Sequence, residues 1–194
     1  MDVSRWVAIV LPGGGYGPIG AVLRLPILVL EARGADTVVV DYPQGDRQQR
    51  ATLEELVQAA SSQVARAVTA AAAAAERVTF VAKSFGTGIL ADLDPAVLSH
   101  ARIEAIWLTP LFGYAAVRSG AIAHGWRSLL IAGDADDYHH PEAHEAVREA
   151  LGADSLVLKD ADHRLEIPGN PMATVDRLRE VVEAVALFTG TDAP

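Results

Sequence analysis

The stretch from Val78 to Leu90 reads VTFVAKSFGTGIL and joins a strand pattern to a helix pattern. Four residues suited to a buried strand lead into Ala82-Lys83-Ser84-Phe85-Gly86, and small and apolar residues follow as at the start of a helix. Ala82 and Gly86 flank the serine with little bulk, which allows a sharp strand-to-helix turn in which the two backbones nearly touch. A serine at the apex of such a turn presents its hydroxyl above the carboxyl edge of a sheet. The usual pattern has glycine where this chain has Ala82.

Strand-like and helix-like segments alternate along the rest of the chain. The strand-like segments are Val7–Leu11, Thr37–Val40, Val78–Val81, Ile103–Leu108, Leu129–Ala132 and Ser155–Leu158. A capping box at Thr52–Glu55 opens a helix that we expect to continue through the alanine run Ala70–Ala75. Unbroken apolar strands separated by helices predict a parallel sheet covered on both faces. We therefore expect one α/β domain over residues 1–194, a three-layer αβα sandwich around a mostly parallel sheet of about six strands.

Composition excludes several classes of protein. The formal net charge is −9 with no compensating basic stripe, which argues against nucleic acid as a partner. The chain has no cysteine, and therefore no disulfide, thiolate metal site or cysteine nucleophile. No apolar run reaches the roughly 18–20 residues that a membrane span needs, and the N-terminus has no signal-peptide pattern. We expect a cytoplasmic protein that does not bind membranes; its oligomeric state is not indicated.

Polar residues follow several of the predicted strands. Ser84 follows the third strand, Gly133–Tyr138 with three aspartates follows the fifth, and Asp160–His163 follows the sixth. The carboxyl ends of parallel strands meet at one edge of the sheet, where such folds carry their working groups. A serine, an acid and a histidine thus occur in chain order, each beyond a different strand end.

This arrangement resembles the α/β-hydrolase superfamily, specifically its small members without a lid. The resemblance runs from Val7 to the last helix and lacks only the usual first two antiparallel strands. It implies that Ser84 is the nucleophile, that His163 is the general base and then acid, and that Asp136 orients the imidazole. The Gly-x-x-Asp pattern of the family falls on Asp136, although Asp134 and Asp137 lie close enough to serve instead.

The resemblance also implies an oxyanion hole and a reaction. The amide after the nucleophile, that of Phe85, and one from the loop after the first strand would receive the oxyanion. That loop amide maps to Gly14, with Gly15 the next candidate, although Pro12-Gly13 stands where many members have His-Gly. The implied activity is hydrolysis of a small ester or thioester through an acyl-enzyme, with no cofactor and no metal.

The interval between the fourth and fifth strands, Thr109 to Arg127, is too short for a folded cap. An open site suits short-chain substrates. Tyr16 and Phe112 are candidates for its apolar wall, and Lys83 for attracting an anionic substrate. Aromatic packing between helix and sheet explains the aromatic residues equally well, and Lys83 has solvation as its alternative.

The glycine loop supports a rival hypothesis. Gly15-Tyr16-Gly17-Pro18-Ile19-Gly20 is a G-x-G-x-x-G sequence between a strand and a helix, and Asp41 follows the next strand 26 residues beyond Gly15. This is the fingerprint of a dinucleotide-binding protein of Rossmann type. It leaves the serine, acid and histidine unexplained, and little chain for a substrate domain.

Two further classes remain. His139, His140 and His144 cluster near Asp136 and could form a metal site, but the spacing does not match H-E-x-x-H. We expect these histidines to face solvent at the start of a helix. A non-catalytic binding protein with a hydrolase fold is the other alternative, although a binding role gives no reason to keep all three residues of a triad.

Overall fold

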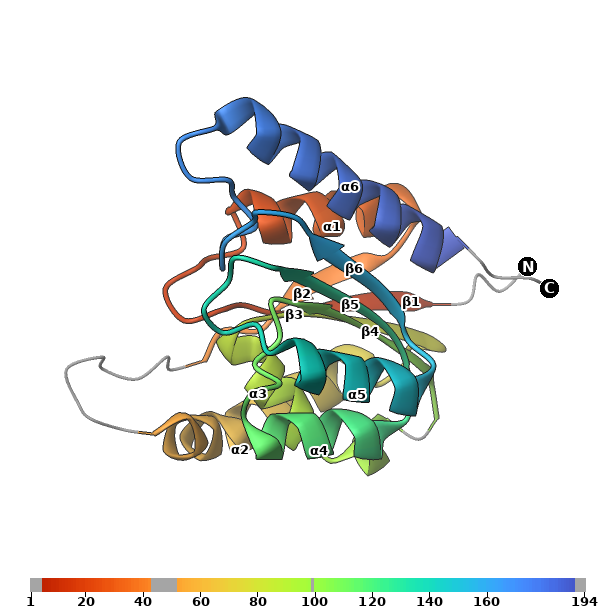
Figure 1. Cartoon of the computed structure of the whole chain (residues 1–194). Helices are drawn as coiled ribbons and strands as arrows, with labels where there is room; N and C mark the ends of the chain where they lie inside the picture. The colour runs from red at the N-terminus through yellow and green to blue at the C-terminus, as the bar shows by residue number, and fades with distance from the viewer. Residues whose placement is uncertain (1–4, 43–51, 99, 191–194) are drawn as a thin grey trace.

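A computed structural model describes residues 5–42, 52–98 and 100–190 (Figure 1). Six strands form one sheet in the order β2-β1-β3-β4-β5-β6, and every neighbouring pair is parallel. The strands are β1 (Trp6–Leu11), β2 (Asp36–Val39), β3 (Arg77–Lys83), β4 (Arg102–Leu108), β5 (Arg127–Gly133) and β6 (Asp154–Leu158). The predicted parallel sheet of about six strands is confirmed.

Helices cover both faces of the sheet (Figure 1). One face carries α1 (Ala21–Ala32) and α6 (Pro171–Gly190), and the other carries α2 (Leu53–Ala72), α3 (Phe85–Asp92), α4 (Ala115–His124) and α5 (Pro141–Leu151). A short 3₁₀ helix spans Pro95–Leu98. These are the three layers of the predicted αβα sandwich. No helix in the described part of the chain is long and apolar enough to cross a membrane.

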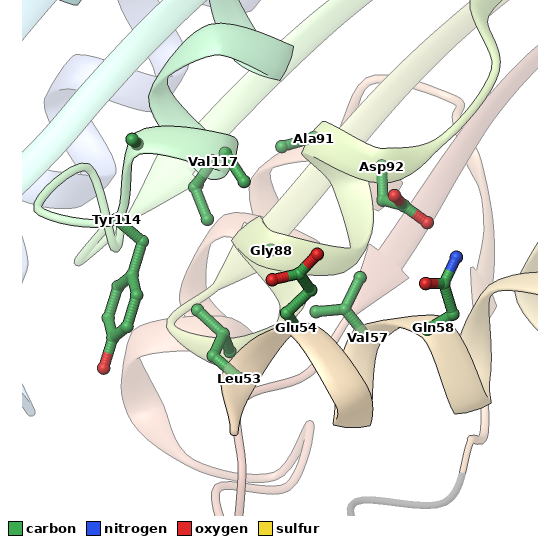
Figure 2. Close-up of a pocket in the computed structure, with 11 residues that line it drawn as sticks. Leu53, Glu54, Val57, Gln58, Gly88, Ala91, Asp92, Tyr114 and Val117 are labelled. Atoms are coloured by element: carbon green, nitrogen blue, oxygen red, sulfur yellow. The ribbon is translucent and has the colours of Figure 1, made fainter. Parts of the chain in front are cut away.

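The helix α3 lies between α2 and α4, and a cavity of about 440 Å³ opens along it (Figure 2). Leu53 and Val57 of α2 form one wall, and Tyr114 and Val117 at the start of α4 form the other. Gly88 of α3 contributes to the floor, where a Cβ would lie 3.1 Å from Val57 Cγ2. The cavity is therefore a groove between helices on the α2–α5 face.

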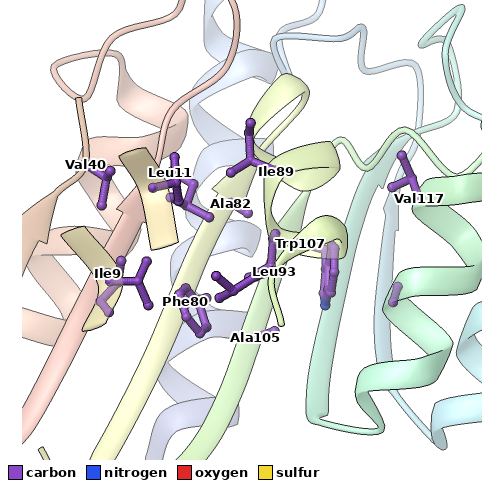
Figure 3. Close-up of a cluster of buried hydrophobic side chains, with 14 of the residues drawn as sticks. Ile9, Leu11, Val40, Phe80, Ala82, Ile89, Leu93, Ala105, Trp107 and Val117 are labelled. Atoms are coloured by element: carbon purple, nitrogen blue, oxygen red, sulfur yellow. The ribbon is translucent and has the colours of Figure 1, made fainter. Parts of the chain in front are cut away.

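Alternate residues of the central strands enter two separate cores. Ile9, Phe80 and Trp107 belong to the core toward α2–α5, and Figure 3 shows them among the side chains of that cluster. Val10 and Val81 point to the opposite side, toward α1 and α6. Successive side chains of a strand face opposite sides of a sheet, so a sheet covered on both faces needs unbroken apolar strands. This explains why the strands were recognisable as apolar runs.

The helix α2 begins as predicted and ends earlier than predicted. The Thr52 hydroxyl accepts the Glu55 N–H at 3.2 Å, and the Glu55 carboxylate accepts the Thr52 N–H at 2.8 Å, which completes the capping box. The prediction that the helix continues to Ala75 is wrong, because α2 ends at Ala72. The N–H of Ala75 bonds the Ala72 carbonyl as the chain turns toward β3.

At the amino edge of the sheet, the fully buried Glu104 carboxylate is surrounded by arginines. Its oxygens lie 2.9 Å from Arg77, 3.0 Å from Arg102 and 3.1 Å from Arg127. The Thr79 hydroxyl also donates to this carboxylate, at 3.3 Å. A buried carboxylate is costly unless opposite charges and hydrogen bonds compensate it. Here both kinds of partner are present.

Candidate active site

The sharp turn after β3 places Ser84 at the carboxyl edge of the sheet. Ser84 separates β3 from α3 and adopts φ +50° and ψ −116°, a strained conformation for a residue with a side chain. A Cβ at Gly86 would lie 2.1 Å from the carbonyl oxygen of Leu11, so only glycine fits there. Ala82 is fully buried, and its methyl group is accommodated. The close backbone approach expected from the sequence is therefore present.

Ser84, His163 and Asp136 form a continuous hydrogen-bonded array. His163 Nε2 lies 2.8 Å from Ser84 Oγ, and His163 Nδ1 lies 2.8 Å from Asp136 Oδ2. Because a carboxylate only accepts, the bond to Asp136 places the imidazole proton on Nδ1 and leaves Nε2 to accept the serine hydroxyl proton. The side chain of His163 is 30% exposed, whereas that of Asp136 is 2% exposed. The array thus runs from the interior to the surface.

Among the three neighbouring aspartates, only Asp136 contacts the imidazole. Burial by itself would raise the pKa of Asp136, but hydrogen bonds from His163 and from the Tyr138 N–H lower that pKa below its ordinary value. Asp134 instead accepts the Asp160 N–H at 2.5 Å, and Asp137 is exposed. The geometry therefore selects Asp136 as the acid of the array.

The loop that carries His163 is tightly held. The Asp162 carboxylate accepts the N–H of Arg164 at 2.8 Å and that of Glu166 at 3.0 Å. Two residues of this loop, Asp160 and Leu165, have positive φ angles of 60° and 56°. Such conformations cost about 1–3 kcal/mol each and persist only where the surroundings enforce them. The imidazole is therefore presented by a loop with little freedom.

The glycine loop runs beside Ser84. The Tyr16 N–H bonds the Gly13 carbonyl at 3.2 Å, which closes a turn with Gly14 and Gly15 at its centre, and Gly15 has φ +73°. A Cβ at Gly13 would lie 3.2 Å from Ser84 Cβ, so the loop packs closely on the serine. That Gly14, Gly15 and the Phe85 amide form an oxyanion hole stays a prediction.

Tyr16 occupies the place that a dinucleotide would need. Its hydroxyl accepts the Val22 N–H at 3.3 Å in the first turn of α1. A Cβ at Gly20 would lie 2.4 Å from the Tyr16 ring, so this ring covers the N-terminus of the helix. A Rossmann fold binds the pyrophosphate at that N-terminus. The G-x-G-x-x-G loop therefore packs on its own tyrosine.

The histidine cluster is a packing arrangement. The expectation that these histidines face solvent is wrong for His144, which is 4% exposed and pairs with Ser155 Oγ at 2.8 Å. Burial lowers the pKa of His144 to about 4. His139 contacts the His144 ring edge-on at 5.1 Å, and His140 packs against Gly113. Within the described ranges, no group of three or more histidine or acidic side chains could hold a metal ion.

Two residues proposed for substrate contact lie in the interior. Phe112 is buried against Trp107 and His144, at ring distances of 5.8 and 6.1 Å, as the packing alternative expected. Lys83 is 1% exposed and faces the α1–α6 side of the sheet, beneath the histidine loop. Neither side chain reaches solvent at the carboxyl edge. The solvated position that was the alternative for Lys83 is therefore wrong, and its attraction for an anionic substrate stays a prediction.

Tyr138 is a residue of the site that sequence reasoning missed. Its ring lies 5.0 Å from the His163 imidazole at an interplanar angle of 54°, and the residue is 50% exposed. The signal was an aromatic residue two positions beyond the predicted acid. The cavity of Figure 2 lies elsewhere, since Ser84, Asp136 and His163 do not line it.

Solved structures of other proteins share this fold. No family model matches the sequence, and no curated protein matches it. Est1E from Butyrivibrio proteoclasticus, solved with ferulic acid bound, superimposes with a TM-score of 0.71 at 14% identity, covering 97% of this chain and 90% of that one. An α/β serine hydrolase without a lid from Xanthomonas campestris has a TM-score of 0.65 at 19% identity, covering 100% and 87%. A serine hydrolase homologue from Coxiella burnetii superimposes with a TM-score of 0.66 at 19% identity, covering 96% of this chain and 86% of that one.

These likenesses, together with the parallel sheet and its helical layers, define the class of protein: the chain has the α/β-hydrolase fold. The fold that the sequence resemblance implied is confirmed. Because identities of 14–19% establish only the fold, the activity has to be argued from the site.

Proposed function

We propose that this protein is a serine hydrolase that cleaves a small ester or thioester through an acyl-enzyme intermediate. The observation that carries the proposal is the array Asp136–His163–Ser84, with both hydrogen bonds at 2.8 Å and the serine on a strained turn. Three residues far apart in the chain meet with the geometry that nucleophilic catalysis requires.

In the proposed reaction, Ser84 Oγ attacks the substrate carbonyl carbon while His163 Nε2 takes the hydroxyl proton. The tetrahedral intermediate collapses when His163 returns that proton to the leaving alcohol or thiol, and the acyl group remains on Ser84. Water then attacks the acyl-enzyme, with His163 as base, and the carboxylic acid leaves as the proton returns to Ser84. Asp136 holds the imidazole tautomer and stabilises its charged form throughout.

The oxyanion would be received by backbone amides. The Phe85 amide opens α3 directly after the nucleophile, and the Gly13–Tyr16 turn brings the amides of Gly14 and Gly15 beside Ser84. Preorganised amides of this kind stabilise a developing oxyanion, and each contributes roughly 100-fold or more to turnover.

A small substrate is proposed because the connection over the site is short. Between β4 and β5 the only helix is α4, which packs so closely on α3 that a Cβ at Gly120 would lie 2.2 Å from the Ala91 carbonyl oxygen. A helix packed there cannot act as a cap above Ser84. The exposed Tyr138 ring beside His163 gives the open site one aromatic wall.

Covalent labelling tests the proposal most directly. An organophosphonate should label the wild-type protein once, and Ser84→Ala should abolish both the label and the hydrolysis of p-nitrophenyl acetate. Ser62→Ala, on the exposed side of α2, is the matched control and should label normally. Label that persists in Ser84→Ala would exclude this nucleophile. A wild type that neither labels nor hydrolyses esters would favour a non-catalytic binding protein.

A further inference from the structure

Lys83 is a buried cation that the proposed reaction does not use. It is the last residue of β3 and is 1% exposed. Its ammonium lies 3.0 Å from the carbonyl oxygen of His163 and 3.2 Å from the hydroxyl of Thr109. It also lies 4.7 Å from the centre of the Tyr16 ring, over its face. The side chain thus joins the nucleophile strand, the glycine loop and the histidine loop.

The partners of this ammonium are neutral. Charged and titratable groups surround it at longer range: Asp136 from the loop after β5, Asp162, His163 and Arg164 from the loop after β6, and Tyr16 from the glycine loop. Among the described residues, none forms a salt bridge with Lys83 within 4.0 Å. A buried ammonium without a paired carboxylate is expensive, and a methionine would fill the same volume more cheaply.

We propose that Lys83 is the positioning residue of His163, which its ammonium holds through the backbone carbonyl. The inference rests on the proposed function of the site. Asp136 and Ser84 hold the imidazole of His163, and the Asp162 carboxylate holds the loop after it, but none of these bonds contacts the His163 carbonyl. Lys83 donates to that backbone from beneath, on the side of the sheet opposite α3. His163 is therefore held both at its imidazole ring and at its main-chain carbonyl.

The surrounding backbone makes such a support necessary. Thr109, the second acceptor, has φ +45°, and Asp160 and Leu165 bracket His163 with positive φ angles. The Lys83 ammonium bonds the hydroxyl of one strained residue, Thr109, and the carbonyl of His163, which lies between the other two, so its removal would let this backbone relax. Reacting groups must be held within a fraction of an ångström, and a displacement of about 1 Å costs roughly 100-fold in rate.

The charge of Lys83 makes this support dependent on pH. Burial lowers the pKa of Lys83 to about 8, although the negative charges of Asp136 and Asp162 oppose that shift. Below this pH the ammonium is a charged donor, and charged donors form hydrogen bonds about twice as strong as neutral ones. Above it the amine is neutral and holds the His163 carbonyl less firmly. Turnover should therefore decline as pH rises through the titration of Lys83.

Kinetics of Lys83→Met test the positioning role. The chain has two lysines, so Lys159→Met, at an exposed position, is the matched control. With p-nitrophenyl acetate, Lys83→Met should lower kcat about tenfold or more, with little change in KM, and should lose the basic limb of the kcat profile. Lys159→Met should keep both. A kcat within about twofold of wild type, or a basic limb unchanged in Lys83→Met, overturns the proposal.

Nuclear magnetic resonance of the wild type tests the coupling without requiring activity. Lysine labelled with ¹³C at Cε gives one signal for each lysine, which Lys159→Met assigns, and the ¹³Cε1 signal of His163 is assigned by its loss in His163→Gln. The His163 signal should show a step at the pH where Lys83 titrates. Absence of that step overturns the proposal even if Lys83→Met does not fold. A wild type that hydrolyses no ester but shows the step would refute the proposed function and leave the contact between Lys83 and His163 standing.

Discussion

The two edges of the sheet each bury a charge, and they treat it in opposite ways. At the amino edge, Glu104 lies among three guanidinium groups at 2.9–3.1 Å. At the carboxyl edge, Lys83 is held by a hydroxyl and a carbonyl, at 3.2 and 3.0 Å. The first charge has opposite charges in direct contact, whereas the second has neutral hydrogen-bond partners, with the negative charges of Asp136 and Asp162 only at longer range. The buried charge at the amino edge therefore favours stability, whereas the buried charge at the carboxyl edge costs stability beside the proposed catalytic residues.

Backbone strain follows the same division. The non-glycine residues with positive φ in the described ranges are Ser84, Thr109, Asp160 and Leu165, and each lies beyond the carboxyl end of a strand. Strain of this kind collects at functional sites because a rigid scaffold can enforce it. The paired register of Lys83 with Leu108, and of Leu108 with Ile131, brings these strand ends level. The difference between the edges is thus a difference in backbone as well as in charge.

The largest expected effect is on activity at the carboxyl edge. Asp136→Asn should lower kcat by about 10⁴-fold, because the amide stabilises the wrong imidazole tautomer. The melting temperature should change little, since an amide of the same size can still accept the Tyr138 N–H. Steady-state hydrolysis of p-nitrophenyl acetate and thermal melting followed by circular dichroism measure the two quantities. The exposed neighbour gives the control Asp137→Asn, which should retain wild-type kcat; equal losses in both variants would contradict the assignment of the acid.

The matching change at the amino edge should have the reverse outcome. Glu104→Gln removes the buried negative charge that three guanidinium groups share, and we expect the free energy of unfolding to fall by about 2 kcal/mol. The value is below that of a fully buried pair, because solvent screens Arg102 and Arg127, which are partly exposed. The kcat of the folded enzyme should stay within about twofold of wild type. Urea unfolding gives the energy, with the exposed Glu76→Gln as control; an unchanged midpoint would argue that the cluster is not stabilising.

The smallest expected effect is a gain in the free energy of unfolding, opposite in sign to the loss expected for Glu104→Gln. The pKa of Lys83 is lowered from its ordinary value of 10.5 to about 8, so the folded state binds the proton less tightly than the unfolded state. Between these two pH values, the unfolded state carries more protons, and stability should rise with pH. Lys83→Met should abolish this rise of stability with pH and should raise the free energy of unfolding at pH 7 by about 1 kcal/mol. This value already allows for the two hydrogen bonds that Lys83 donates to the His163 carbonyl and the Thr109 hydroxyl, which the variant loses.

Urea unfolding at pH 7 and at pH 9.5 measures both parts of this prediction, with Lys159→Met as the control. The comparison of the edges holds if removing the buried charge weakens the protein at Glu104 and strengthens it at Lys83. The opposite result would be a Lys83→Met variant that is less stable at neutral pH and whose free energy of unfolding still rises with pH. It would show that the ammonium stabilises the fold.

Much of the site could be predicted from local pattern. The Ala-x-Ser-x-Gly sequence marks the turn at Ser84 because only small residues let β3 and α3 approach, and the clash at Gly86 is the physical reason. His163 and a group of three aspartates that includes Asp136 could be located because parallel strands bring their carboxyl ends to one edge. The burial of Lys83 and His144, and the contact of Tyr138 with His163, could not be found in this way. They depend on loops that meet only after the sheet has formed.

By itself, the amino-acid sequence determined the order of strands and helices, the apolar strands that two covered faces require, and the three residue types at three strand ends. Periodicity and steric limits act over a few residues, so a single chain displays them directly. The tertiary structure alone decided which aspartate meets the imidazole, which side of the sheet the ammonium of Lys83 enters, and that Tyr16 covers the start of α1. Each of these is a contact between segments distant in the chain, and its energy depends on burial and distances that exist only in the folded protein.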